Sequence, residues 1–533
     1  MKKPHVNLLW FCALIVSPLF GQNNDRYTQV NLVSDVPGLA AHTDPNLVNA
    51  WGIARSATSP WWVNSAGKGL SLVYDATGAP FPAASPIRVT IPANNGFSVP
   101  TGIVFNSTSD FPIAPGFPAV FLFSNINGTI SGWNPNVNAS TAVVKVNTPG
   151  AVYTGLTIAD SRIGSTLYAA NFASGNVDTF DANFNPVTLS PGAFHDPAVP
   201  AAFHPFNVMN VGGNIFVEFA QPQGNEEAKG PGLGFVDEFS PNGQLILRLQ
   251  NGPWMNAPWG VTMAPATFGS LGGQLLVGQF GSGQIAAFNP ATGAFEGLLM
   301  GTNNAPIVID GLWGIMFGNS GPNGSPNELY FAAGINDEAH GLFGKLTAAP
   351  QIESPGPITL APGQSIPLNV RLSSAAGPTG VMLTLTSSNP GVVTVTPTAV
   401  VAAGESAPRP APIVTGVAPG QATITISAPG FPTITIPVNV TFTMSFVPAS
   451  IVAHLTDRQA RPLLVLAAPA ASQLTIALSS SNASVASTPS NVTIPAGQQS
   501  VAVPISLTGT GSAAITATVV GGGGTATLPV TVQ

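Results

Sequence analysis

Short apolar stretches recur along the first two thirds of the chain at a nearly constant interval. Six of them carry a glycine or an asparagine at a matching position, and the spacings between successive positions are 50, 53, 52, 53 and 54 residues. A steady period of this length predicts an array of similar units, each of which buries its apolar faces only against its neighbours. The six positions are Gly52, Gly102, Gly155, Asn207, Gly260 and Gly314.

Each period contains the same order of strand-like segments. In the first period, the motif NAWGIA is followed by PWWVNS, then by LSLVYD and, after a turn, by PIRVTIP. Apolar, β-branched and aromatic residues bounded by Gly, Pro and Asn are typical of short strands. The sixth period lacks its fourth strand, and RYTQVNLV at 26–33 offers one at the other end of the unit. The pattern predicts an all-β chain that begins with a six-bladed β-propeller closed by this N-terminal strand.

The last third of the chain has a different repeat. Ser-Ser-Asn at 387–389 recurs at 480–482, and Ala-Gly at 403–404 recurs at 496–497, so both offsets are 93 residues. Segments such as VMLTLTS and TITIPVNV, which alternate or run apolar, are typical of β-sandwiches of ~90 residues, and the Pro-rich stretch before them is typical of a linker. We expect a propeller at 22–349, a linker at 350–357 and two immunoglobulin-like domains at 358–441 and 442–533.

Two kinds of motif carry a resemblance to known proteins. The glycine motif, its apolar second strand and its aromatic-ended third strand resemble the NHL-repeat class of propellers. More closely, HTDPNLVNAWGIA at 42–54 and INDEAHGLFG at 335–344 resemble an uncharacterised family of exported bacterial proteins. This resemblance covers about residues 26–348 and implies fold and export, with no established active site. The C-terminal segments resemble bacterial immunoglobulin-like repeats, which implies a spacer or stalk.

The first residues predict export. Lys2 and Lys3 precede an apolar run at 6–20, which is typical of a secretory signal peptide, here expected at 1–21. The run is shorter than the roughly 20 residues of a spanning helix, so an uncleaved anchor is the less favoured alternative. Cys12, the only cysteine, lies within the run, and no later apolar segment is long enough to span a membrane. We expect a secreted protein without disulfides, in the periplasm, at the cell surface or outside the cell.

Composition and charge narrow the classes of partner. Charged residues make up 7% and hydrophobic residues 44% of the chain, with 58 Gly and 52 Pro, which suits short strands and turns better than helical bundles. Residues 22–350 contain nineteen Asp and Glu against nine Lys and Arg. An acidic unit without a basic stripe argues against nucleic acid and against anionic lipid. A protein, a glycan and a small molecule stay open as partners.

Candidate chemistry falls on one rim of the predicted propeller. In an antiparallel meander, the loops between second and third strands share one end with the connections between blades, so the imidazoles and carboxylates in these segments, including all four propeller histidines, should converge. Such groups can bind a divalent metal or act as an acid–base pair, whereas HTDPN and FHDP can equally be Asx or helix-cap turns. The rim residues are His42, Asp44, His195, Asp196, His204, Glu226, Glu227, Asp310, Asp337, Glu338 and His340, with Lys229 beside the two glutamates.

Tryptophans on or beside the repeated strands are expected to pack between blades. Trp254, in the loop NGPWMNAP, is the exception, because a loop tryptophan can stack on a sugar or a peptide. Packing is the favoured alternative for this residue too.

The inner strands favour a binding protein over an enzyme. The positions before the repeated motif residues hold bulky or neutral side chains, so no ring of carboxylates lines these strands. We expect an exported binding or cell-envelope interaction protein that presents the propeller rim on two spacer domains and needs no cofactor. The alternative is a metal-dependent lyase or lactone hydrolase with rim histidines and carboxylates around a divalent ion, and a purely structural role is the third. The inner-strand positions are Trp51, Thr101, Thr154, Phe206, Trp259 and Trp313.

Overall fold

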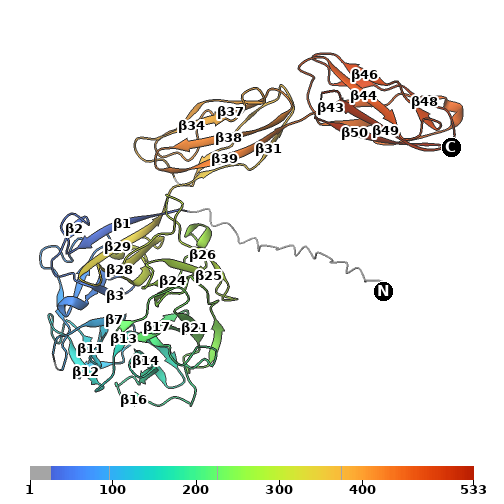
Figure 1. Ribbon diagram of the computed structural model, residues 1–533. Coiled ribbons are helices and arrows are strands. Elements are labelled where there is room, and N and C mark those ends of the chain that lie inside the picture. Colours follow the sequence, from blue (N-terminus) through green and yellow to red (C-terminus); the bar gives the residue numbers. More distant parts are fainter. Residues whose placement is uncertain (1–25, 95, 225, 374, 522) are drawn as a thin grey trace, which may run out of the picture. The chain divides into compact units, whose positions relative to one another are not determined.

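The described residues form strands, turns and short 3₁₀ segments, which confirms the expected all-β class. The chain divides into two compact units, Met1–Ala349 and Pro350–Gln533 (Figure 1). In the described part of the chain, no helix is long and apolar enough to cross a membrane. The signal peptide expected at 1–21 lies outside the described residues. The computed structural model describes residues 26–94, 96–224, 226–373, 375–521 and 523–533.

The first unit contains six sheets, here numbered 1 to 6, that follow one another along the chain and are antiparallel except for the β1–β2 pair of sheet 6. In sheets 1 to 5, four strands pair in sequence order, because short turns join antiparallel neighbours. The strands are β3 (Ala50–Ala54), β4 (Trp61–Ser65), β5 (Leu70–Tyr74) and β6 (Arg88–Thr90) in sheet 1; β7 (Pro100–Phe105), β10 (Phe121–Asn125), β11 (Thr129–Trp133) and β12 (Val143–Asn147) in sheet 2; β13 (Tyr153–Ser161), β14 (Gly164–Asn171), β15 (Asn176–Phe180) and β16 (Pro186–Val187) in sheet 3; β17 (His204–Val211), β18 (Asn214–Ala220), β21 (Phe235–Phe239) and β22 (Leu245–Arg248) in sheet 4; and β23 (Pro258–Met263), β24 (Leu275–Gln279), β25 (Ile285–Phe288) and β26 (Phe295–Leu298) in sheet 5.

Sheet 6 combines strands from both ends of the first unit. β27 (Leu312–Phe317), β28 (Glu328–Ile335) and β29 (His340–Ala348) are followed in this sheet by β1 (Tyr27–Ser34) and β2 (His42–Thr43). β1 runs antiparallel to β29 and covers the edge of β29 that would otherwise be open. Two small hairpins complete the unit: β8 (Pro112–Ala114) with β9 (Phe117–Pro118), and β19 (Pro222–Gln223) with β20 (Glu226–Glu227).

The first strands of the six sheets contact one another in order, and β27 contacts β3, so they close a ring. The repeated motif residue lies where neighbouring first strands approach most closely. A Cβ at Gly102 would lie 2.6 Å from the backbone nitrogen of Leu156, so a larger residue would push the strands apart. Asn207 is the exception to glycine, and its side chain donates a hydrogen bond of 2.6 Å to the carbonyl oxygen of Trp259 on the next first strand.

Neighbouring sheets pack on each other through both faces of their central strands. In β14, Leu167 and Ala169 share a core with side chains of sheet 2, whereas Tyr168 and Ala170 share a core with side chains of sheet 4. The alternation follows from the two-residue period of a strand. Continuous apolar runs such as TLYAAN are therefore central strands covered on both sides.

The second unit contains two apolar cores, each enclosed by its own sheets. Both sets have a five-stranded sheet of the same strand order, in which a short early strand pairs in parallel with the last strand. Buried and exposed residues alternate along these strands, as expected for sheets covered on one face. The first set comprises β30 (Ile352–Glu353), β31 (Ile358–Leu360), β32 (Ser365–Pro367), β33 (Arg371–Leu372), β34 (Val381–Ser387), β35 (Val393–Val395), β36 (Thr398–Val401), β37 (Ile413–Gly416), β38 (Gly420–Ala428) and β39 (Phe431–Val440); the second comprises β40 (Met444–Val447), β41 (Ile451–Ala453), β42 (Gln459–Ala460), β43 (Leu463–Leu466), β44 (Leu474–Ser480), β45 (Ala486–Ser487), β46 (Asn491–Ile494), β47 (Ser500–Ala502), β48 (Ile505–Leu507), β49 (Gly511–Val519) and β50 (Thr525–Val532).

Candidate functional site

The ring has two ends: the N-side, where the first strands begin, and the C-side, where they end. On the N-side, buried aromatic rings fill the ring axis. The Trp313 ring stacks on Trp51 and on Phe280, with 3.8 Å between ring centroids in both pairs. Because these rings are large, rigid and almost completely buried, they close this end. We call the set the aromatic plug; it comprises Trp51, Phe172, Phe206, Trp259, Phe280 and Trp313.

Two acidic loops meet above the plug, although more than a hundred residues separate them in the sequence. Glu226 and Glu227 lie between β18 and β21, and Asp337 and Glu338 lie between β28 and β29. Lys229 joins the loops, because its Nζ lies 3.9 Å from Glu227 Oε1 and 4.0 Å from Asp337 Oδ1. The same Nζ lies 4.5 Å from the centroid of the Phe280 ring, which belongs to the plug. The structure therefore brings together four of the seven carboxylates that the repeat assigned to this rim.

Burial controls the protonation of two of these carboxylates. Glu227 is 8% exposed, and burial raises its pKa to about 7; nearby Lys229 lowers it in part, and the neighbouring glutamates raise it. Burial also raises the pKa of Glu338, against a hydrogen bond of 2.6 Å from Asn49 Nδ2 to Glu338 Oε2. This cluster thus gains charge as the pH rises through neutrality.

The loop between β28 and β29 is held in an uncommon backbone conformation. Asn336, Asp337 and Glu338 have φ values of 56°, 52° and 61°, in the left-handed region. Asn and Asp adopt this region more readily than Glu. Asp310 Oδ2 accepts a hydrogen bond of 2.6 Å from the backbone N–H of Asn336, so Asp310 belongs to this end of the ring as an anchor of the loop.

Two of the N-side histidines have separate partners. His204 Nδ1 lies 2.7 Å from the carbonyl oxygen of Phe172, and His340 Nδ1 lies 2.8 Å from Asp35 Oδ2. His42 lies in β2, beside β1. Among the described residues, no group of three or more His, Cys, Asp and Glu side chains is placed to hold a metal ion.

Asp44 and Asp196 anchor segments of the fold. Asp44 Oδ2 accepts a hydrogen bond of 3.0 Å from the hydroxyl of Tyr74, and its Oδ1 accepts one of 2.9 Å from the backbone N–H two residues later. Asp196 is buried and receives two hydrogen bonds from Arg248, one of them 2.7 Å long from Nη2, and this pairing lowers the pKa of Asp196. Both carboxylates are therefore used within the fold.

His195 lies away from the other ring histidines. The adjacent Phe194 is buried against Tyr168 and Phe239, with centroid distances of 5.7 and 5.5 Å, and its N–H donates to the carbonyl oxygen of Gly243, which follows β21. β21 runs parallel to its first strand and ends on the C-side. The expectation that all four ring histidines share one rim is wrong for His195, because Phe194 anchors this connection near the opposite end.

Trp254 packs against the protein. Its ring stacks on Phe295 of β26 with 3.9 Å between centroids and an angle of 4°, and its Nε1 donates a 3.0 Å hydrogen bond to the carbonyl oxygen of Gln250. One face of the indole and its single donor are thereby occupied. This is the packing alternative that the loop sequence left open.

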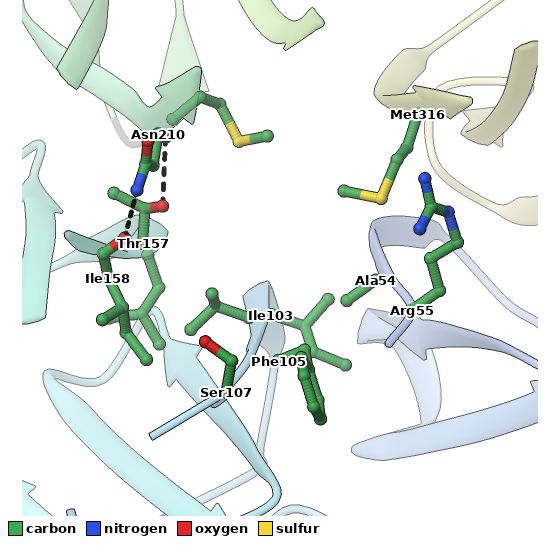
Figure 2. Close-up of a pocket in the computed structure, with 12 residues that line it drawn as sticks. Ala54, Arg55, Ile103, Phe105, Ser107, Thr157, Ile158, Asn210 and Met316 are labelled. Atoms are coloured by element: carbon green, nitrogen blue, oxygen red, sulfur yellow. Dashed lines mark hydrogen bonds between the residues drawn. The ribbon is translucent and has the colours of Figure 1, made fainter. Parts of the chain in front are cut away.

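On the C-side, the ring axis opens into a cavity of about 350 Å³, which we call the axial cavity (Figure 2). Five of the six first strands, β3, β7, β13, β17 and β27, supply its walls with residues at their C-terminal ends or just beyond. Towards the plug, a second and much smaller space of about 10 Å³ lies between the repeated glycines. The lining residues are Ala54, Arg55, Ile103, Val104, Phe105, Ser107, Leu156, Thr157, Ile158, Met209, Asn210 and Met316.

The wall of the axial cavity combines apolar side chains with nearly as much polar surface. Asn210 Nδ2 donates a 2.7 Å hydrogen bond to the carbonyl oxygen of Ile158, and the backbone N–H of Asn210 donates one of 3.1 Å to Thr157 Oγ1, as Figure 2 shows. Arg55 lies on the other side of the cavity, beside Met316. No described Asp, Glu or His lines this space.

Sequence reasoning did not identify the axial cavity. Its residues are ordinary strand residues, and each is about fifty positions from its counterpart in the next repeat. The available signal is the position two residues after each repeated motif residue. Five of these six positions line the cavity: Ala54, Val104, Thr157, Met209 and Met316. Without the curvature of the ring, nothing in the sequence indicates that these side chains surround one space.

The sequence is similar to proteins of one virus. No family model matches it. Uncharacterized protein R648 of Acanthamoeba polyphaga mimivirus is 31% identical over 329 residues, which cover 59% of this chain and 78% of R648. Uncharacterized protein L690 of the same virus is 31% identical over 328 residues, covering 59% of this chain and 84% of L690. The chain belongs to the family of R648 and L690. Since residues 350–533 are about a third of the chain, these matches include part of the first unit.

The R648/L690 family corrects the resemblance inferred from short motifs. The chain's curated relatives are mimivirus proteins, and no family model supports NHL or immunoglobulin-like repeats, so the assignment to an exported bacterial family is wrong. The physical reason lies in the motif itself. A glycine followed by an apolar strand is what any close approach of neighbouring first strands requires, so the motif indicates packing rather than ancestry.

Solved structures resemble this member of the R648/L690 family only weakly. Domains 4 and 5 of the S-layer protein SbsC are 18% identical to this chain, with a TM-score of 0.14. The match covers 28% of this chain and 75% of the SbsC chain. Myxococcus xanthus glutaminyl cyclase is 12% identical, covers 47% of this chain and 90% of its own, and has a TM-score of 0.27. Scores this low assign no common fold.

Proposed function

We propose that this chain is an exported binding protein, with a six-bladed β-propeller as its first unit and two immunoglobulin-like sandwiches as spacers in its second. The closed ring of first strands and the completion of sheet 6 by β1 support the propeller. Two apolar cores enclosed by sheets of the same strand order support the sandwiches. Lys2, Lys3 and the apolar run at 6–20 support export.

The axial cavity is the observation that carries the binding function. It is concave, exposes polar and apolar surface in nearly equal shares and is built from paired strands, which makes it largely preformed. A preformed cavity with both kinds of surface can hold a small molecule that has an apolar body and a polar group. The sealed N-side strengthens this assignment, because it leaves one open end of the axis.

Binding is favoured over the alternative of a metal-dependent lyase or lactone hydrolase. That alternative requires several histidines and carboxylates around one ion. His204 and His340 instead contact different partners, and the carboxylates above the plug lie at the opposite end of the ring from the axial cavity.

Titration with N-phenyl-1-naphthylamine, a neutral dye that fluoresces in apolar surroundings, tests the proposal on the full chain. We expect binding of one dye per chain. Met209→Trp, which fills the axial cavity, should weaken binding at least about tenfold. Met263→Trp is the matched control, because Met263 is partly exposed at the end of first strand β23 but does not line the cavity. An equal loss of dye affinity in both variants would contradict the proposed binding function. So would the absence of dye binding to the native chain.

A further inference from the structure

Charge in the axial cavity is restricted to one side chain. Ile103, Leu156, Met209 and Met316 give the walls an apolar character, and Arg55 is the one charged residue among those that line the space. Figure 2 shows its guanidinium at the margin, beside Met316. A ligand that fills this space therefore meets apolar side chains, nearly as much polar surface, and a single positive charge.

Arg55 keeps donors available for a ligand. Its Nε donates a 2.7 Å hydrogen bond to the carbonyl oxygen of Phe317, and its Nη2 lies 3.5 Å from the carbonyl oxygen of Gly318. A guanidinium has five N–H groups, so these two contacts fix its position without using all of its donors. A fork of N–H groups held in one place matches the geometry of a carboxylate.

Arg55 also lacks the counter-charge that three other cations of the first unit have. Arg248 pairs with Asp196, Lys345 Nζ lies 2.5 Å from Glu328 Oε1, and Lys229 lies between two acidic loops. None of the ion pairs formed by described carboxylates involves Arg55. Its guanidinium is half-buried, and burial lowers the pKa of Arg55, although a guanidinium stays charged at neutral pH.

We propose that the axial cavity binds a compact apolar molecule with one carboxylate, whose oxygens are held by the guanidinium of Arg55. This inference rests on the binding function proposed above and names its ligand class. A ligand anion would supply the missing counter-charge, while the apolar body would cover the walls.

The size of the cavity sets the shape of this ligand. At ~30 Å³ per water-sized group, about 350 Å³ holds about a dozen such groups. The narrow space beneath it, bounded by Gly52, Gly102 and Trp259, is about 10 Å³ and does not admit a long tail. A flat bicyclic body therefore fits better than an extended alkyl chain.

Three isosteric probes test the assignment by calorimetry on the full chain: 2-naphthoate, 2-naphthalenemethanol and 2-naphthylmethylammonium. We expect 2-naphthoate to bind at least about tenfold more tightly than the alcohol and the ammonium to bind most weakly. Arg55→Gln should remove the preference for 2-naphthoate and leave the affinity for the alcohol within about twofold. Arg162→Gln, which changes an arginine that does not line the cavity, should change neither affinity.

A salt titration of the native chain avoids any effect of a substitution on folding. Binding of 2-naphthoate should weaken as salt is raised, because salt screens a charge pair, while binding of the alcohol should not weaken. Equal affinity for 2-naphthoate and the alcohol, with N-phenyl-1-naphthylamine still bound in the cavity, would overturn the ligand class and leave the binding function intact. If the dye does not bind either, both proposals fail.

Discussion

The two ends of the ring are built from the same six repeats, yet one is filled and the other is open. On β27, Trp313 near the start is fully buried in the aromatic plug, whereas Met316 near the end lies on the wall of the axial cavity. The same first strands supply residues to both ends. The difference lies in the size of the side chains that point to the axis, so a few residues decide which end is available to a ligand.

The charged side chains also differ between the two ends. The acidic loops, with their left-handed backbone and the raised pKa values of Glu227 and Glu338, lie above the plug. The axial cavity has one charged side chain, Arg55, which is held by backbone carbonyl oxygens. A change of pH should therefore act on the N-side and leave binding on the C-side unaffected. Three experiments test this division.

The largest effect is expected from truncating the plug. Trp313→Ala removes a fully buried ring that stacks on two others, so the free energy of unfolding should fall by about 3–5 kcal/mol. Met316→Ala, on the same strand but partly exposed in the cavity, should cost about 1 kcal/mol. Urea unfolding followed by circular dichroism measures both. Similar losses for the two variants would show that the ends do not differ in packing.

A smaller effect is expected from Glu227→Gln, and it should depend on pH. The pKa of Glu227 is raised to about 7 in the folded state, so between its ordinary value of 4.5 and 7 the folded chain binds more protons than the unfolded chain. Stability contributed by this group is therefore complete below pH 4.5 and is lost as the pH rises through 7. Replacing the carboxyl should raise the free energy of unfolding at pH 8 by up to about 3 kcal/mol relative to the native chain.

Asp337→Asn is the matched control for Glu227→Gln. Asp337 belongs to the same acidic cluster, but its side chain is 96% exposed. Urea unfolding of the native chain and both variants at pH 5 and pH 8 makes the comparison. If Asp337→Asn reproduces the gain at pH 8, general repulsion within the cluster, rather than burial of Glu227, would be its source.

No effect is expected when ligand binding on the C-side is measured across the same pH range. Because no described Asp, Glu or His lines the axial cavity and Arg55 stays charged, the affinity for 2-naphthoate should change less than about twofold between pH 6 and pH 8. Calorimetry at three pH values measures it. A clear pH dependence would mean that the two ends of the ring are coupled.

Local patterns in the sequence determined the class of the chain and the position of its strands. Period-two alternation, apolar runs bounded by Gly, Pro and Asn, and a repeated glycine depend on contacts between adjacent strands, so they can be read without knowing the whole fold. The all-β prediction is confirmed for this reason. The six-bladed arrangement, the domain boundaries and export stay predictions.

The acidic part of the candidate site was also within reach of the sequence. Loops 226–229 and 337–338 follow the second strand of their sheets, and the alternation of loops between two ends puts them on one rim. His195 was not within reach, because a single buried neighbour, Phe194, anchors its connection near the other end. The relation to R648 and L690 rests on similarity over hundreds of residues, which short motifs do not report.

Only the tertiary structure decided which end of the ring is open. Ala54, Met209 and Met316 look like ordinary strand residues, and they line one space because the ring closes and brings five strand ends together. The lack of a counter-charge at Arg55 is likewise a property of the folded chain, since it depends on which of the described carboxylates lie within reach after folding. Local pattern therefore specifies strands and turns, while the side chains that face the common axis specify the site.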